Sequence, residues 1–110
     1  MADINVSELV KKMLEAAEGA LKEKWPYTKN YAESEFKKIG ESIVFIQNEV
    51  LAGNMSEERA GMHIEIQKNA ARMVLLSLEG LGILAVEAAI NAALAVIKET
   101  VNTALDFALL

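Results

Sequence analysis

Cysteine is absent from this chain, and proline, histidine and aromatic residues are scarce. Without a thiol, the chain forms neither a disulfide framework nor a thiolate metal site, which fits a reducing compartment. The single proline and the 5% of aromatic residues leave aliphatic side chains and alanine to supply most of the 53% apolar content. The β-branched runs and regular turn signals of an all-β fold are also missing. The composition therefore predicts an all-α protein.

Positive charge is also in short supply, with 11 basic residues against 16 acidic ones and a net charge of -5. Such a chain repels phosphate backbones and anionic lipid surfaces, so nucleic acid is not an expected partner. Residues 1–5 lack the basic start and apolar run of a signal peptide, and we expect a cytoplasmic protein. A length of 110 residues predicts one domain over residues 1–110.

One apolar stretch, residues 73–97, is long enough to span a bilayer. It contains Glu79, Glu87 and Asn91, however, and a carboxylate in mid-membrane costs about 2.5 kcal/mol or more. We therefore interpret this stretch as buried within protein, and membrane contact is disfavoured.

The first expected helix covers residues 6–24. Asn5, followed three residues later by Glu8, is typical of a capping box at a helix start. The pair Trp25-Pro26 is expected to end this helix, because the residue before proline avoids the helical region. A turn is predicted at residues 26–28.

The second expected helix covers residues 30–52 and ends at Gly53-Asn54, a pair suited to the left-handed position past a helix end. Its apolar residues recur in steps of four and three, the period of left-handed helix packing. They are Ala32, Phe36, Ile39, Ile43, Ile46 and Val50.

A third helix is expected to begin at Ser56, whose hydroxyl can cap the first turn. Only Gly80 and Gly82 are candidate stop signals after it. In one interpretation Gly80 is left-handed and Leu81 packs back on Leu76, giving a four-helix bundle with a turn at Gly80-Gly82. In the other, the helix continues with at most a kink at the glycines.

The spacing of the apolar residues favours the continuous helix, because one four-three pattern crosses both glycines. It comprises Ala60, Ile64, Gln67, Ala71, Val74, Leu78, Leu81, Ala85, Ala88, Ala92 and Ala95. The predicted fold is thus an antiparallel bundle of three helices whose last helix is long. At 1.5 Å per residue this helix would measure about 80 Å, too long for a compact monomer. Its far half would need another chain, so we expect a homo-oligomer, a dimer or higher.

The predicted interface has two apolar faces, one of small and one of large side chains. The small face would let a second helix approach closely, and the large face would fill the gap to a third helix. The small face comprises Ala85, Ala88, Ala92 and Ala95. The large face comprises Ile83, Ile90, Leu94, Ile97, Val101 and Leu105.

No catalytic, cofactor or metal site is predicted. The sole histidine, His63, has no carboxylate one helical turn away, so we expect a helix-surface or interface position for it. The charged residues Glu65, Lys68, Arg72 and Glu79 are expected to form a solvated face, with a buried network that fixes oligomer register as the alternative.

Glu87 and Asn91 lie one helical turn apart in the most apolar stretch. A buried carboxylate needs a partner, so Glu87 either faces solvent or pairs across an interface, for instance with Lys98 or Arg72 of a neighbouring chain. A pocket near these two residues is a further alternative.

Trp25, Tyr27 and Tyr31 form an aromatic cluster that is expected to close one end of the bundle, with a ligand pocket as the alternative. The methionines are expected to fill gaps in the core, with an adaptable binding surface as the alternative. These are Met13, Met55, Met62 and Met73.

These observations favour a non-enzymatic helical protein that self-associates as a structural or protein-interaction module. Two alternatives belong to other classes. One is a peripheral membrane-active protein that uses the alanine-rich C-terminal helix, and the other is a helical bundle that binds a small molecule.

Overall fold

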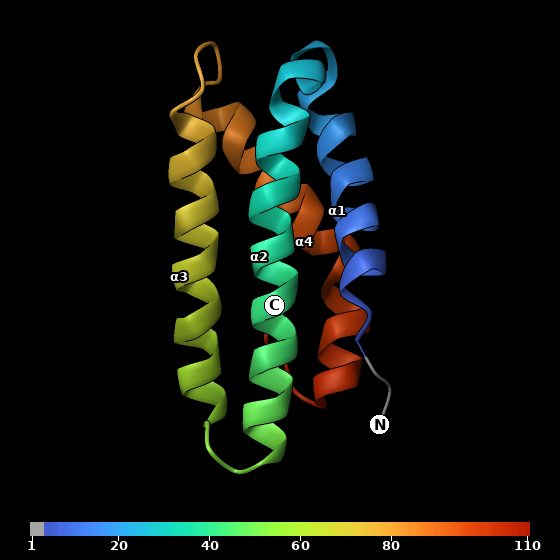
Figure 1. Ribbon diagram of the computed structural model, residues 1–110, viewed down its shortest axis with the longest axis vertical. Helices are drawn as coiled ribbons and strands as arrows, with labels where there is room; N and C mark the ends of the chain where they lie inside the picture. The colour runs from blue at the N-terminus through green and yellow to red at the C-terminus, as the bar shows by residue number, and fades with distance from the viewer. Residues whose placement is uncertain (1–3) are drawn as a thin grey trace.

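The computed structural model describes residues 4–110, and within this range the chain forms four α-helices (Figure 1). Their bounds are α1 Val6–Leu21, α2 Trp25–Leu51, α3 Glu57–Leu76 and α4 Ile83–Leu105, with a short 3-10 helix, η1, at Lys22–Lys24. The helices run alternately up and down, so helices adjacent in sequence are antiparallel. The prediction of an all-helical antiparallel bundle is confirmed.

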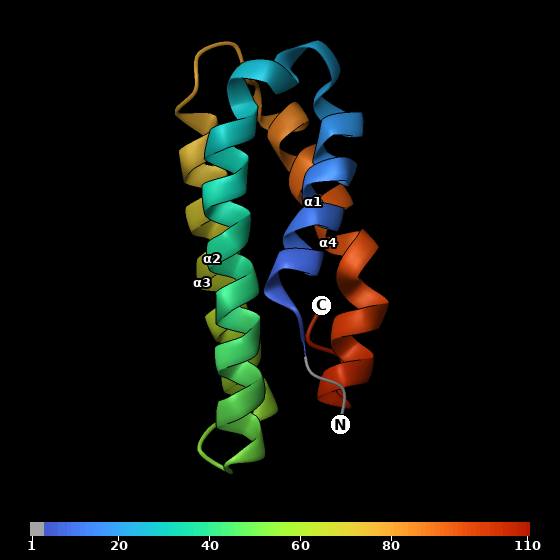
Figure 2. The ribbon, with the colours of Figure 1, turned by 45° about the vertical axis from the view of Figure 1, so that its right-hand side comes forward.

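The helices are arranged as two closely packed pairs, α1 with α4 and α2 with α3 (Figure 2). Packing of α1 on α2 joins the pairs, whereas α3 and α4 touch over a much shorter stretch. The bundle measures 43 × 22 × 18 Å. Because α3 lies at the outer edge in Figure 1, one side of this helix faces away from the rest of the molecule.

Two helix starts are capped as the sequence predicts. The Asn5 side chain accepts a hydrogen bond from the backbone N–H of Glu8 at 3.1 Å, and the Ser56 hydroxyl accepts one from Arg59 at 3.1 Å. Each cap satisfies one of the free N–H groups of a first helical turn. The predicted row along α2 is also confirmed, because Ala32, Phe36, Ile39, Ile43 and Ile46 are fully buried and Val50 is half-buried.

The connection between α1 and α2 differs from the prediction. The first helix ends at Leu21, the chain reverses within Lys22–Lys24, and α2 begins at Trp25. No turn forms at residues 26–28, because Pro26 lies in the first turn of α2, where its missing N–H is not needed. The reversal is instead made by Lys22, which adopts a positive φ of 54°.

The prediction of one continuous C-terminal helix is wrong. The third helix ends at Leu76, residues 77–82 leave the helical path, and α4 returns antiparallel to α3 from Ile83. Gly80 has a φ of +87°, the left-handed conformation considered in the alternative interpretation. The Tyr27 hydroxyl donates a hydrogen bond to the carbonyl of Glu79 at 3.4 Å, so α2 holds this turn from the side.

The last residues fold back on α4 instead of extending it. Asp106 has a φ of 63°, and the side-chain Oδ1 of Asn102 then accepts hydrogen bonds from the backbone N–H groups of Leu109 and Leu110 at 2.9 and 3.0 Å. This places Leu109 against α3 as well as α4, beside Ile64. The tail therefore helps to fill the space where α3 and α4 are in limited contact.

Substitution of Gly80 tests the turn. We expect Gly80→Ala to lower the free energy of unfolding by about 1–2 kcal/mol, because an L side chain is strained at this positive φ. An added Cβ would also come within 3.2 Å of the Tyr27 hydroxyl. Gly19→Ala is the matched control and should raise stability by about 0.5–1 kcal/mol, because Gly19 is helical with open space around it. Equal effects in urea unfolding would contradict the left-handed turn.

Candidate functional site

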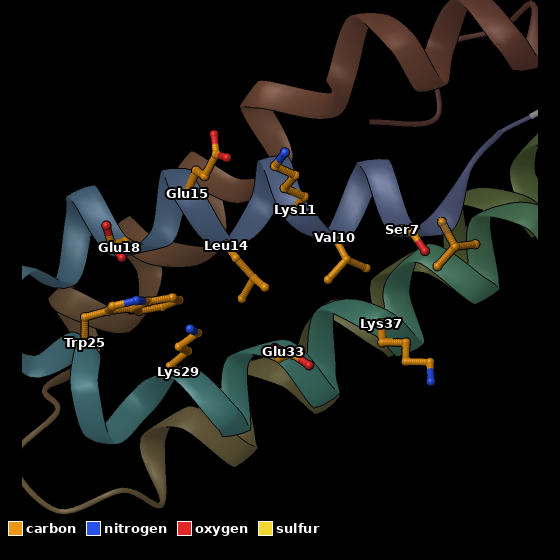
Figure 3. A pocket seen from close by; sticks show the side chains of 11 residues that line it. Ser7, Val10, Lys11, Leu14, Glu15, Glu18, Trp25, Lys29, Glu33 and Lys37 are labelled. Atoms are coloured by element: carbon orange, nitrogen blue, oxygen red, sulfur yellow. The ribbon is translucent and has the colours of Figure 1, made fainter.

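A groove of about 510 Å³ lies between α1 and α2 (Figure 3). Its apolar surface comes from Val10 and Leu14 of α1 and from Trp25 at the start of α2, whose side chains point into the space between the helices. The two helices approach closely at the end of the groove formed by Val6, since a Cβ added at Gly40 would lie 3.0 Å from a methyl carbon of this residue. The groove can therefore accept an apolar group between the two helices.

Charged side chains surround this groove in equal numbers of each sign. They are Lys11, Glu15 and Glu18 on α1 and Lys29, Glu33 and Lys37 on α2, all exposed. Such a rim selects neither a cation nor an anion. Ser7 is the hydroxyl residue of the groove, but it has no histidine to activate it, because His63 belongs to α3. The arrangement suits binding and provides no catalytic pair.

The predicted aromatic cluster is divided among different surroundings. Trp25 is 8% exposed and joins both the core and the groove. Tyr27 covers the turn at residues 77–82, and Tyr31 is half exposed. The sequence suggested two positions for a ligand pocket, one near Glu87 and Asn91 and one at the aromatic cluster. The structure has a groove at the second position, beside Trp25.

Glu87 pairs with Arg72 of the same chain, whereas the sequence predicted that Glu87 would either face solvent or pair with a residue of a neighbouring chain. The Arg72 Nε and Nη2 atoms donate to the two oxygens of Glu87, the second at 3.3 Å, and Nη1 donates to Asn69 Oδ1. The hydrogen bond that the Arg72 guanidinium donates to Glu87 raises the pKa of Arg72 above its usual value, while desolvation opposes this rise and the negative charges of Glu87 and Glu65 add to it. This two-pronged pair joins α3 to α4 across their short contact.

The remaining charged residues of the predicted row do not join this pair. Glu65 accepts a hydrogen bond from Lys68 at 2.9 Å on the same helix, and Glu79 lies in the turn after α3. Asn91 lines a hollow of about 320 Å³ with Lys68 and Lys98, and Glu87 is not part of that lining. Glu87 and Asn91 therefore do not form one pocket.

His63 lies against an aromatic ring of α2. Its ring centroid is 5.5 Å from that of Phe45, and its Nδ1 atom is buried without a hydrogen-bond partner. Within residues 4–110, no group of three or more histidine or carboxylate side chains could hold a metal ion. His63 thus lies at the α2–α3 contact, with one ring nitrogen unsatisfied.

The predicted interface residues are split between the core and the surface. The fold of a single chain already buries Ile90, Leu94, Ile97, Val101 and Leu105. Ile83 is 59% exposed, Ala88 and Ala95 are exposed, and Ala85 and Ala92 are half-buried. The large and small rows therefore do not combine into one association surface.

Sequence reasoning missed an exposed apolar row on α3. Met62, Ile66 and Met73 are 63%, 63% and 70% exposed, so the prediction that Met62 and Met73 fill gaps in the core is wrong. Met13 is buried as predicted, and Met55 is half-buried. The missed signal is a second four-three-four spacing, through residues 62, 66, 69 and 73, on the opposite side of α3 from its buried row.

Comparison with known proteins finds no matching family model, curated protein or solved structure. In the part of the chain that the structure describes, no helix combines the length and the apolar character needed to cross a membrane.

Proposed function

We propose that this protein is a non-enzymatic interaction module that self-associates, and that the outer side of α3 is its binding surface. The observation that supports this most is the exposure of Met62, Ile66 and Met73, each at least 63%, along three turns of one helix. Isolated exposed apolar residues are ordinary, but an aligned row of large ones is typical of a protein-binding surface. Its burial by a partner helix would remove apolar area from water at about 25 cal/mol per Å².

The exposed row of α3 is a better candidate than the alanines of α4. An alanine side chain presents one methyl group, so Ala88 and Ala95 offer little apolar area. The methionines add flexible side chains that adapt to the shape of a partner. Helix-in-groove recognition uses large residues at this same spacing of three and four.

The α1–α2 groove favours a second candidate function, the binding of a small apolar ligand. Val10, Leu14 and Trp25 provide the apolar contacts, and the charged rim would orient a ligand that has a polar end. This function does not require self-association, so the two candidates can be tested separately.

Substitution on α3 tests the proposed function. We expect the protein to associate as its concentration rises, and Ile66→Glu to raise the dissociation constant by about tenfold to a hundredfold, or about 1.4–2.7 kcal/mol. The physical reason is that association would bury the new carboxylate without a partner. Sedimentation velocity over a range of concentrations measures the effect.

Leu84→Glu is the matched control, because Leu84 is 84% exposed on α4 and receives the same charge. It should leave the association unchanged. A parent protein that stays monomeric at high micromolar concentration would contradict self-association. Loss of association in the Leu84 variant but not in the Ile66 variant would move the surface to α4.

A further inference from the structure

The outer side of α3 has a pattern that is complementary to itself when the helix is reversed. Residues spaced alternately by three and four form a row that we name the α3 seam: Arg59, Met62, Ile66, Asn69, Met73 and Leu76. We infer that the seam binds the α3 seam of a second copy, with the two helices antiparallel about a two-fold axis. This inference rests on the proposed function, because it names the partner of the same surface.

The antiparallel register follows from the positions of the large residues. If Met62 lies opposite Met73 of the second copy, then Arg59 lies opposite Leu76, and the two-fold axis repeats each pairing. At each end of the seam, the large side chains of Arg59 from one copy and Leu76 from the other would therefore lie side by side.

Charge also favours this register. On the side of the seam nearest α4, Glu65 of one copy would face Arg72 of the other, and the two-fold axis makes this ion pair twice. The Arg72 side chain is 25% exposed and that of Glu65 is 59% exposed, so both remain accessible beside their contacts within the chain. The second carboxylate would approach a guanidinium that Glu87 already holds in place.

Arg59 provides a further complementary charge. The last turn of α3 contains no basic residue to balance the partial negative charge of its carbonyl groups. In the antiparallel register, Arg59 of the second copy lies beside this turn, opposite Leu76. A cation at this position is favourable, and the symmetry supplies one to each helix.

Asn69 is the polar residue in the middle of the seam. The two copies of Asn69 would lie in adjacent layers, about 4.5 Å apart along the helix axis. A central asparagine commonly fixes register and the number of strands in paired helices, at some cost in stability. In the parallel alternative, Arg59 would face Arg59, and Glu65 would face the uncharged Ala70, so no ion pair would be gained.

Disulfide cross-linking tests the orientation, because the chain has no cysteine of its own. Met62→Cys and Met73→Cys proteins are made with tags of different mass and oxidised under mild conditions, separately and as a mixture. We expect the mixture to lose its monomer bands to one mixed dimer, while each variant alone stays unlinked. In the antiparallel register, identical thiols are about 16 Å apart along the axis, beyond the reach of a disulfide.

The controls separate the orientation from the existence of the surface. Val96→Cys introduces a thiol at an exposed position of α4 and should not cross-link. Self-linking of each seam variant, with association still lost in Ile66→Glu, would overturn the antiparallel inference and leave the proposed function intact. Association without any cross-linking at the seam would also overturn the inference. Absence of association would reject the proposed function itself.

A charge reversal gives a second readout. Glu65→Lys should raise the dissociation constant by about tenfold, and high salt should reduce the difference from the parent, because two attractive pairs become repulsive. Glu99→Lys is the control, since Glu99 is exposed on α4 and away from the seam. Equal effects of the two variants would exclude a specific contact between Glu65 and Arg72.

Discussion

Phe36→Ala is expected to lower the free energy of unfolding by about 3–5 kcal/mol, which would remove a large part of the stability of a small domain. Phe36 is fully buried near the middle of α2, surrounded by other buried apolar side chains. Truncation loses the burial of the ring and leaves a cavity that a close-packed bundle fills only in part. Urea unfolding followed by circular dichroism should show a lower midpoint with an unchanged slope.

The matched control for this variant is Phe45→Ala on the same helix. Phe45 is 48% exposed and contacts His63 at the edge of the α2–α3 contact, so its loss should cost about 1 kcal/mol or less. Because the chemical change is identical, the difference between the two variants reports burial alone. Similar losses would mean that α2 presents a different face to the core.

Ile90→Ala is expected to cost about 2–5 kcal/mol at any protein concentration. The sequence pattern alone assigns Ile90 to an interface between chains, whereas the structure buries it completely within one chain. A core position loses stability by the same amount in dilute and concentrated samples, while an interface position loses less as association weakens. Thermal or urea unfolding over a range of concentrations distinguishes these two roles.

Leu84→Ala is the control on α4. Leu84 is 84% exposed, and we expect its truncation to change stability by about 0.5 kcal/mol or less. A strong concentration dependence for the Ile90 variant, with little loss in dilute solution, would contradict the observed core of the single chain.

Local hydrogen-bonding signals predicted the helix starts well. Asn5 and Ser56 act through side chains and backbone groups three residues apart, so the sequence contains all the information that these caps need. The buried row along α2 was predicted equally well, because its large apolar residues allow only one face of the helix to be buried. Pro26 was misread because proline ends one helix as readily as it begins another, and the distinction depends on the conformation of Lys22.

Alanine explains why the last two helices were joined in the prediction. In α4 alanine occupies buried, half-buried and exposed positions, so a four-three pattern can be drawn through it in more than one phase. The pattern that crossed the glycines used Ala85, Ala88, Ala92 and Ala95, whereas the buried face is centred on Val86, Ile90, Ile97 and Val101. The phase of the buried residues does change at the turn. The alanine pattern concealed this change, because a methyl group fits a core and a surface almost equally well.

The site was predictable only in part. Arg72 was named as a partner for Glu87, yet the sequence could not show that one chain folds back to supply it. The outer row of α3 was missed because methionine suits both a core gap and a binding surface. Its exposure depends on α3 lying at the edge of the bundle, a tertiary property that the spacing of Met62 and Met73 does not reveal.

The close pairing of α1 with α4 has a consequence for the order of folding. The contacts of α1 with α2 and of α2 with α3 join neighbours in the chain and need only short loops, whereas α1 and α4 come from opposite ends. Closing a loop of about 80 residues costs about 1.8 kcal/mol more in chain entropy than closing one of ten residues. The local hairpins are therefore favoured to form first, and α4 docks on α1 late. Much of the core is completed only in this last step, so the bundle gains its stability as a single cooperative unit.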